Sequence, residues 1–190
     1  LTGMASKGPI DKGAINAYKV VNGAKDALLG TTTTDSSGNF LVNIGSYAGP
    51  AIMEVTGGSY KDEATGITTA LGTTMSSIVP DTSVSTTVSV TPISDAVFQI
   101  AKAAPGGLTS ANIATALGTV KSQLGFDPIS TVPADATSAT SAAATDAAKI
   151  YACYLGVISQ YLKDNAGKTL AQAVTDLAGA AQGTGTGLTN

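Results

Sequence analysis

Few residues in this chain could carry out chemistry on a bound molecule. The 190 residues include no histidine, no tryptophan and a single cysteine. Without histidine the chain lacks the base of Ser-His-Asp and Cys-His triads, which is also the commonest general base near pH 7. The most frequent ligand of zinc, copper and non-haem iron sites is missing too. We therefore predict no enzyme activity, no catalytic residues, no metal site and no cofactor.

The single cysteine, Cys153, lies in the apolar stretch YACYLGVI at residues 151–158. One cysteine cannot form a disulfide within the chain. A free cysteine among apolar neighbours usually behaves as a small buried hydrophobic residue. We expect Cys153 to be buried in helical packing, with an intermolecular disulfide as the alternative.

Two patterns resemble ligand sites, but turns and helix ends explain them better. Residues 166–169, AGKT, match the end of a phosphate-binding P-loop, yet Leu162 occupies the place of its first glycine. A helix, not a strand, is expected before them. Asp35 and the pair Asp62-Glu63 offer carboxylates to calcium, but no D-x-D-x-D-G loop accompanies them. We predict that these carboxylates lie in exposed turns.

The charge of the chain argues against nucleic-acid and membrane partners. Ten basic and 13 acidic residues give a net charge of −3, and lysines nowhere cluster. A phosphate backbone and an anionic lipid surface both require a basic patch. The most apolar stretch, residues 142–162, contains two charges and has helical periodicity, so we predict no transmembrane segment.

The composition favours export. Charged residues make up 12% of the chain, about half the usual share, and threonine, serine, alanine and glycine take their place. Charge-poor, threonine-rich surfaces are common in secreted bacterial proteins. The chain begins at Leu1 without methionine, which we interpret as a mature or trimmed product. We expect an extracellular or outer cell-surface location.

Residues 1–91 are predicted to form an antiparallel β-sandwich. Short runs rich in Val, Ile, Thr and Tyr are separated by Gly, Asn and Asp, with no helical period between them. The strongest candidate strands are GAINAYKVV, NFLVNI, AIMEVTGG and VSTTVSV. Residues 35–38, DSSG, have the composition of a hairpin turn.

Residues 92–190 are predicted to form an α-helical subdomain of about four helices with a Gly/Thr-rich tail. The apolar period changes to that of helices, over about 92–104, 109–124, 136–164 and 169–181. Ile150, Tyr154 and Leu155 belong to the apolar stripe expected on the third helix. The fold class is therefore α+β.

Three segments of the first part, GPIDKGAINAYKV, TTTTDSSGNF and AIMEVTGG, carry a family resemblance. They resemble the transthyretin-like, or carboxypeptidase-regulatory-like, β-sandwich. With residues 78–97 and 108–117, the chain is similar to bacterial surface lipoproteins in which this sandwich precedes a helical region. The resemblance implies an exported, often lipid-anchored protein without enzyme activity, used as a spacer, adhesin or assembly module.

A related sandwich, in collagen adhesins, implies one covalent possibility. There a glutamate on the strand that matches AIMEVTGG assists an isopeptide bond between a lysine and an asparagine. Carried over to this chain, the glutamate is Glu54 and the amine is Lys7 or Lys12, although no asparagine of a last strand is evident.

We expect a non-catalytic structural subunit of an extracellular assembly, such as a filament built by strand addition. The alternative is a monomeric surface lipoprotein or adhesin module that binds a glycan or protein, with Tyr47 and Tyr60 offering loop contacts. Alternating Gly and Thr suit a strand laid in a groove, because glycine permits close backbone approach. The predicted contacts between copies are Leu1, Thr2, Gly183, Thr184, Gly185, Thr186, Gly187 and Leu188.

Overall fold

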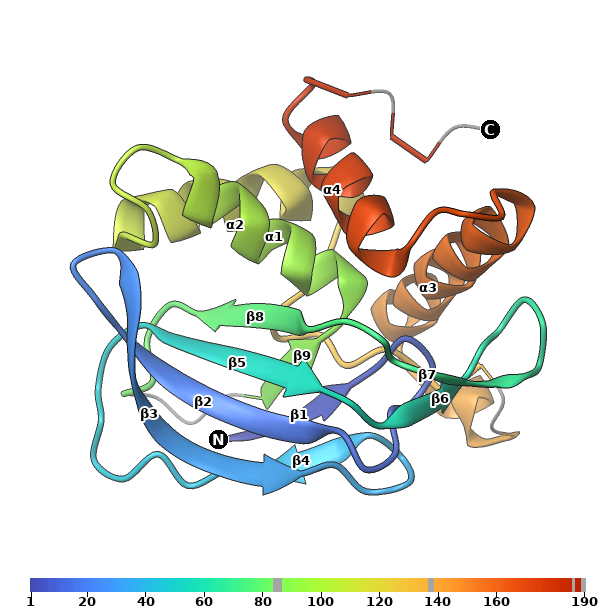
Figure 1. Ribbon diagram of the computed structural model, residues 1–190, viewed down its shortest axis with the longest axis horizontal. Coiled ribbons are helices and arrows are strands. Elements are labelled where there is room, and N and C mark those ends of the chain that lie inside the picture. The colour runs from blue at the N-terminus through green and yellow to red at the C-terminus, as the bar shows by residue number, and fades with distance from the viewer. Residues whose placement is uncertain (84–86, 137–138, 186, 189–190) are drawn as a thin grey trace.

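The computed structural model describes residues 1–83, 87–136, 139–185 and 187–188 (Figure 1). Nine strands come first and helices follow, so the predicted α+β class is confirmed. The strands are β1 (Thr2–Ala5), β2 (Ala14–Val21), β3 (Ala24–Thr33), β4 (Asn39–Leu41), β5 (Ala51–Thr56), β6 (Ser59–Lys61), β7 (Thr68–Ala70), β8 (Met75–Val79) and β9 (Thr87–Val90). The helices are α1 (Pro92–Ala103), α2 (Ser110–Leu124), α3 (Asp146–Asp164) and α4 (Leu170–Ala181), with a short 3-10 helix, η1 (Ala139–Ala143).

The strands form two facing sheets and a small hairpin. The larger sheet has the order β3-β2-β5-β8 and is antiparallel throughout. The smaller has the order β4-β1-β9, in which β1 runs antiparallel to β4 and parallel to β9. Strands β6 and β7 form a two-stranded hairpin, and Ser59 of β6 also pairs with Asp11.

The turns follow from their residue types. Asn22 and Gly23, between β2 and β3, both have positive φ, at 50° and 74°. Two such residues in succession match the turn that suits the twist of a hairpin. After β3, the Asp35 carboxylate accepts hydrogen bonds from the backbone N–H groups of Ser37 and Asn39, both at 2.9 Å. This is the turn that residues 35–38 predicted.

Threonines set the starts of the four α-helices. The side chains of Thr91, Thr109, Thr145 and Thr169 each accept a bond from a backbone N–H in the first helical turn. Such a cap satisfies a donor that the helix leaves unpaired. The third helix begins at Asp146, not near residue 136, because Thr145 caps it there.

Sandwich and helices share one core. Helix α1 lies along β8 (Figure 1) and buries nearly every side chain from Pro92 to Ala101. Tyr151 of α3 is fully buried, and its hydroxyl bonds the Thr91 hydroxyl at 2.5 Å and the Pro128 carbonyl at 2.9 Å. The helical part is therefore anchored on the sandwich by apolar and polar contacts together.

The helical part covers only one side of the sandwich. Helix α1 packs against β8, and Ser89 of β9 donates its backbone N–H to the Ile129 carbonyl at 2.7 Å. On the opposite side, β3 and β4 are the end strands of their sheets. Among the described residues, no other segment forms a backbone hydrogen bond with the outer edge of β3. This open side also exposes Leu28 and Leu41, at 53% and 69%.

One buried hydroxyl in the core has no partner. Ser77 of β8 is fully buried, and its Oγ forms no hydrogen bond within the described part of the chain. A buried polar group without a partner costs about 1–3 kcal/mol. We predict that Ser77→Ala leaves the free energy of unfolding unchanged or raises it by about 1 kcal/mol, measured by urea denaturation.

A matched Ser→Ala change should act in the opposite direction. Ser94 is equally buried, but it completes the capping box of α1 with Thr91. Ser94→Ala should therefore lower stability by about 1 kcal/mol. A loss of stability in Ser77→Ala as large as in Ser94→Ala would contradict the assignment of an unpaired hydroxyl.

Candidate functional site: a buried lysine between the sandwich and helix α3

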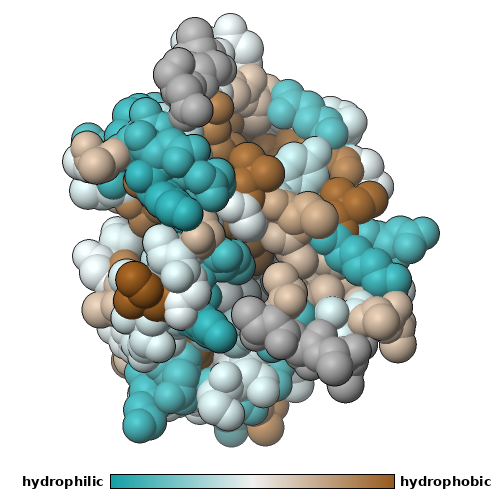
Figure 2. Space-filling model, turned by 90° about the vertical axis from the view of Figure 1, so that its right-hand side faces the viewer, coloured by the Kyte–Doolittle hydropathy of each residue, from teal (hydrophilic) through white to brown (hydrophobic). Residues whose placement is uncertain are grey.

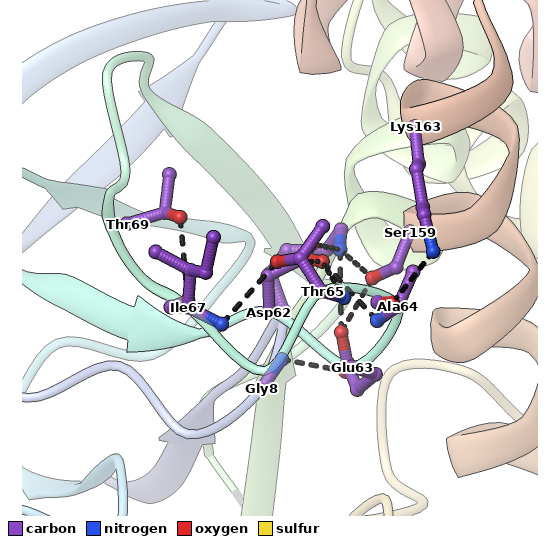
Figure 3. Close-up of polar contacts among 10 residues, drawn as sticks. Gly8, Asp62, Glu63, Ala64, Thr65, Ile67, Thr69, Ser159 and Lys163 are labelled. Carbon is purple, nitrogen blue, oxygen red and sulfur yellow. Dashed lines mark hydrogen bonds and ion pairs between the residues drawn. The ribbon is translucent and has the colours of Figure 1, made fainter.

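The most concentrated group of charges in the described structure surrounds Lys7. This residue follows β1, whereas Asp62 and Glu63 lie in the turn between β6 and β7, and Ser159 lies on α3. Figure 3 shows the two carboxylates and the Ser159 hydroxyl converging from the turn and the helix. Three distant segments of the chain therefore meet at one amine.

The lysine is completely enclosed. Its side chain is 0% exposed, and those of Asp62 and Glu63 are 13% and 12% exposed. Lys7 Nζ lies 3.4 Å from Asp62 Oδ2 and 3.3 Å from Glu63 Oε2, and it also donates to Ser159 Oγ. Ser159 Oγ in turn donates to Glu63 Oε2. Three acceptors thus serve the three N–H bonds of the ammonium group, as a buried charge requires.

Local hydrogen bonds fix the turn that supplies the carboxylates. Asp62 Oδ1 accepts from the N–H groups of Ala64 and Thr65 and from the Thr65 hydroxyl, at 3.0–3.1 Å. Lys163 of α3 donates to the Ala64 carbonyl at 3.1 Å, which fastens the turn to the helix (Figure 3). The Asp62 carboxylate is therefore held in place before it meets the lysine.

Glycine is required where the loop after β1 approaches this turn. Gly8 donates its N–H to Glu63 Oε1 at 2.8 Å and has φ of +61°. A Cβ at this position would lie 2.4 Å from the Lys61 carbonyl oxygen. Any larger residue would separate Lys7 from the two carboxylates.

The cluster shifts the pKa values of Asp62 and Tyr60. Burial alone would raise the pKa of Asp62, but the Lys7 ammonium and the hydrogen bonds from Thr65 lower it below its ordinary value. Burial, followed by the negative charges of Asp62 and Glu63, raises the pKa of Tyr60 to about 12. The Tyr60 ring centroid lies 5.2 Å from Lys7 Nζ, within range of a cation–π contact. The arrangement favours a charged Asp62 and a neutral Tyr60.

The predicted pair Lys7 and Glu54 is not brought together. Glu54 lies on β5 and pairs with Lys25 at 2.8 and 2.9 Å, whereas Lys7 pairs with Asp62 and Glu63. The arrangement therefore gives no support to Glu54 as the helper of an isopeptide bond at Lys7. Its side chain faces the β2–β3 hairpin instead.

The predicted contacts between copies are engaged within the chain itself. Thr2 belongs to β1, the middle strand of its sheet, and the Leu1 amino group donates to the Val42 carbonyl at 2.9 Å. Thr184 and Gly185 donate their backbone N–H groups to the Gly179 carbonyl of α4. Just before them, Gly183 donates its backbone N–H to the Ala180 carbonyl of α4. Farther along the tail, Gly187 has a φ of 74° and Leu188 packs against the core. Thr186 lies outside the described residues.

Cys153 is exposed, contrary to the expectation of burial. It lies on the outer face of α3, where Ile150 and Tyr154 are 46% and 38% exposed. Figure 2 shows the face of the molecule on which α3 lies, with apolar atoms gathered in its upper half. The third helix is therefore covered on fewer sides than its composition predicted.

The other patterns have structural roles. Asp35 caps its own turn, and the described residues contain no group of three or more potential metal ligands. Lys168 pairs with Asp176 at 2.6 Å and Thr169 caps α4, so AGKT joins two helices. Tyr60 is buried, and the Tyr47 hydroxyl donates to the Pro50 carbonyl at 2.9 Å. Neither tyrosine presents the free loop contact that was predicted.

No protein-family model, curated protein or solved structure matches the chain. The resemblance to transthyretin-like surface lipoproteins therefore stays a prediction. None of the described helices has the length and apolar character needed to cross a bilayer.

Proposed function

We propose that the chain is a non-catalytic structural subunit of an extracellular or cell-surface assembly, in which copies associate by strand addition. One observation carries the proposal: the helical part covers the β8 and β9 side of the sandwich and leaves the β3 and β4 side open. An end strand with unpaired N–H and C=O groups accepts a strand from another chain.

Strand β3 is the favoured acceptor. It has ten residues, the most of any strand described, and its half from Leu28 to Thr33 carries no charge. Natural edge strands are usually short or protected by lysine, proline or a bulge. Lys25, Asp26 and two register shifts against β2 lie before Gly30, whereas Gly30–Thr33 pair regularly with β2 and carry no charge. The proposed contact therefore moves from the chain ends, which the fold already uses, to this edge.

A lysine at the free edge should weaken association. Leu28 is 53% exposed, so Leu28→Lys adds a charge at the edge without removing a core side chain. We predict that wild-type protein forms larger species as its concentration rises, and that Leu28→Lys lowers the association constant at least about ten-fold. Light scattering after gel filtration and electron microscopy would measure both.

Ile67→Lys is the matched control. Ile67 is 65% exposed in the turn between β6 and β7, away from the β3 edge. This variant should associate like wild type. A wild-type protein that remains monomeric at millimolar concentration, or equal association of Leu28→Lys and wild type, would exclude assembly through β3.

The second candidate is a monomeric surface module that binds a glycan or protein. A cleft lined by the β2–β3 hairpin, β5, β8 and α1 favours a glycan over a protein, because its volume of about 610 Å³ suits a small molecule. The two candidates differ in the state of the protein in solution, since the first requires association of copies and the second a monomer.

A further inference from the structure

A cleft of about 610 Å³ lies between the tip of the β2–β3 hairpin and helix α1. Clefts that bind small molecules usually measure about 300–1,000 Å³. Glu54 and Ser76, which are neighbours across β5 and β8, form its floor, and Gln99 and Lys102 of α1 form one wall. Lys25 forms the facing wall.

The hairpin tip is fixed, so the cleft exists before any ligand arrives. The Gly23 carbonyl accepts from the Leu108 N–H at 2.7 Å, which joins the hairpin to the loop between α1 and α2. A Cβ at Gly23 would lie 2.0 Å from the Gly106 carbonyl oxygen, so the two backbones are in close contact. Preorganisation of this kind lowers the entropic cost of binding.

The charges in the cleft are unbalanced. Lys25 is neutralised by Glu54, which it contacts at 2.8 Å. Lys102 forms no ion pair with any residue that the structure describes, and its Nζ lies 5.5 Å from the centroid of the Phe98 ring. Two ammonium groups and one carboxylate therefore face the cleft, which favours an anionic ligand.

The remaining groups fit a polyhydroxylated ring. Gln99 donates its amide N–H to Asp95 at 3.1 Å, which fixes the amide and leaves its oxygen as an acceptor. Glu54 offers further acceptor sites and Lys25 a further donor. Leu108 and Phe98 supply apolar surface beside these polar groups. Acceptors, donors and an apolar wall around one unpaired cation match a sugar that carries a carboxylate.

We propose that this cleft binds a uronic acid residue, with the sugar carboxylate on Lys102 and ring hydroxyls on Glu54, Lys25 and Gln99. The inference does not depend on assembly through β3. It assigns a ligand class to the second candidate function.

Titration of the labelled full chain with glucuronic and galacturonic acid, followed by two-dimensional NMR, would test the proposal. Saturable shifts should appear for the amides of Ala24, Thr74 and Gln99. Glucose and galactose are neutral matched sugars, and acetate supplies the carboxylate alone. All three should bind at least about ten-fold more weakly than the uronic acids. Absence of saturable shifts, or acetate binding as strongly as the uronic acids, would overturn the assignment.

Two variants separate the site from general surface charge. Lys102→Gln should weaken uronic acid binding about ten-fold or more, because a charge-assisted hydrogen bond is lost. Lys121→Gln removes an exposed lysine of α2 that pairs with Asp127 instead, and it should bind like wild type. Unchanged binding by Lys102→Gln, or equal loss in both variants with the fold intact by circular dichroism, would refute the site.

Discussion

Asp95→Asn should gain stability over wild type as the pH rises from 4 to 8. The reason is that the wild-type carboxyl is buried at the junction of the two parts. Asp95 lies in the first turn of α1 and is 4% exposed. Burial raises its pKa to about 7, although hydrogen bonds from Gln99 and Ser76 and the charge of Lys102 act against the shift. Nearby Glu54 adds to it.

The sign of the effect follows from proton linkage. The ordinary pKa of this carboxyl is 3.8, so between pH 4 and pH 7 the unfolded chain has lost a proton that the folded chain keeps. Stability contributed by the protonated carboxyl is fully present below pH 3.8 and is lost as the pH rises to about 7. A rise of this pKa from 3.8 to about 7 corresponds to at most about 4 kcal/mol.

Asparagine imitates the protonated acid but does not titrate. The difference in unfolding free energy between Asp95→Asn and wild type should therefore move in favour of the variant by up to about 4 kcal/mol between pH 4 and pH 8. Urea denaturation across this range measures the difference. A constant offset at all pH values would show that Asp95 titrates alike in the folded and unfolded chains.

Asp81→Asn is the same substitution in a different setting. Its carboxylate is exposed and accepts bonds from the backbone and hydroxyl of Ser83, which lower its pKa. A lowered pKa contributes stability at pH values above the ordinary pKa, and this stability is lost as the pH falls. Asp81→Asn should therefore differ from wild type only above the acid end of the range, with no step near pH 7.

The sequence predicted most elements because their signals are local. The period of apolar residues and the turn at Asp35–Gly38 lie within a few residues of the structure that they specify. Strand β5 shows where local reasoning fails. Successive side chains of a strand point to opposite faces, so a strand with one solvated face would expose either Ile52 or Met53, yet both are fully buried, and α1 packs on the adjoining β8. Alternation along one strand cannot reveal a helix 40 residues away.

The charged cluster was missed for a similar reason. Lys7 and Asp62 are 55 residues apart, and each looks like an exposed turn residue in its own segment. The only local signal was the order Asp62, Thr65, Gly66, which is typical of a turn that fixes an aspartate side chain. Nothing in residues 1–12 indicates that a lysine would be enclosed. Burial here depends on how α3 packs against two loops.

Lys7→Met should be the most damaging single substitution of a charged residue. It leaves the Asp62 and Glu63 carboxylates, 13% and 12% exposed, without the cation that both contact. Removal of one partner from a buried ion pair costs about 3–5 kcal/mol, because the remaining charge stays desolvated. We expect this loss in the free energy of unfolding at pH 7, together with earlier hydrogen exchange in α3, which loses the Ser159 contact.

Two further variants test whether the loss comes from the unpaired carboxylates. Lys25→Met removes a lysine that is 44% exposed from its pair with Glu54, and it should cost at most about 1 kcal/mol. Adding Glu63→Gln to Lys7→Met removes one stranded charge and should restore part of the stability. Two results would show that packing of the lysine stem rather than its charge holds α3 on the sandwich. One is a loss of unfolding free energy in Lys7→Met no larger than in Lys25→Met, and the other is a double variant less stable than Lys7→Met.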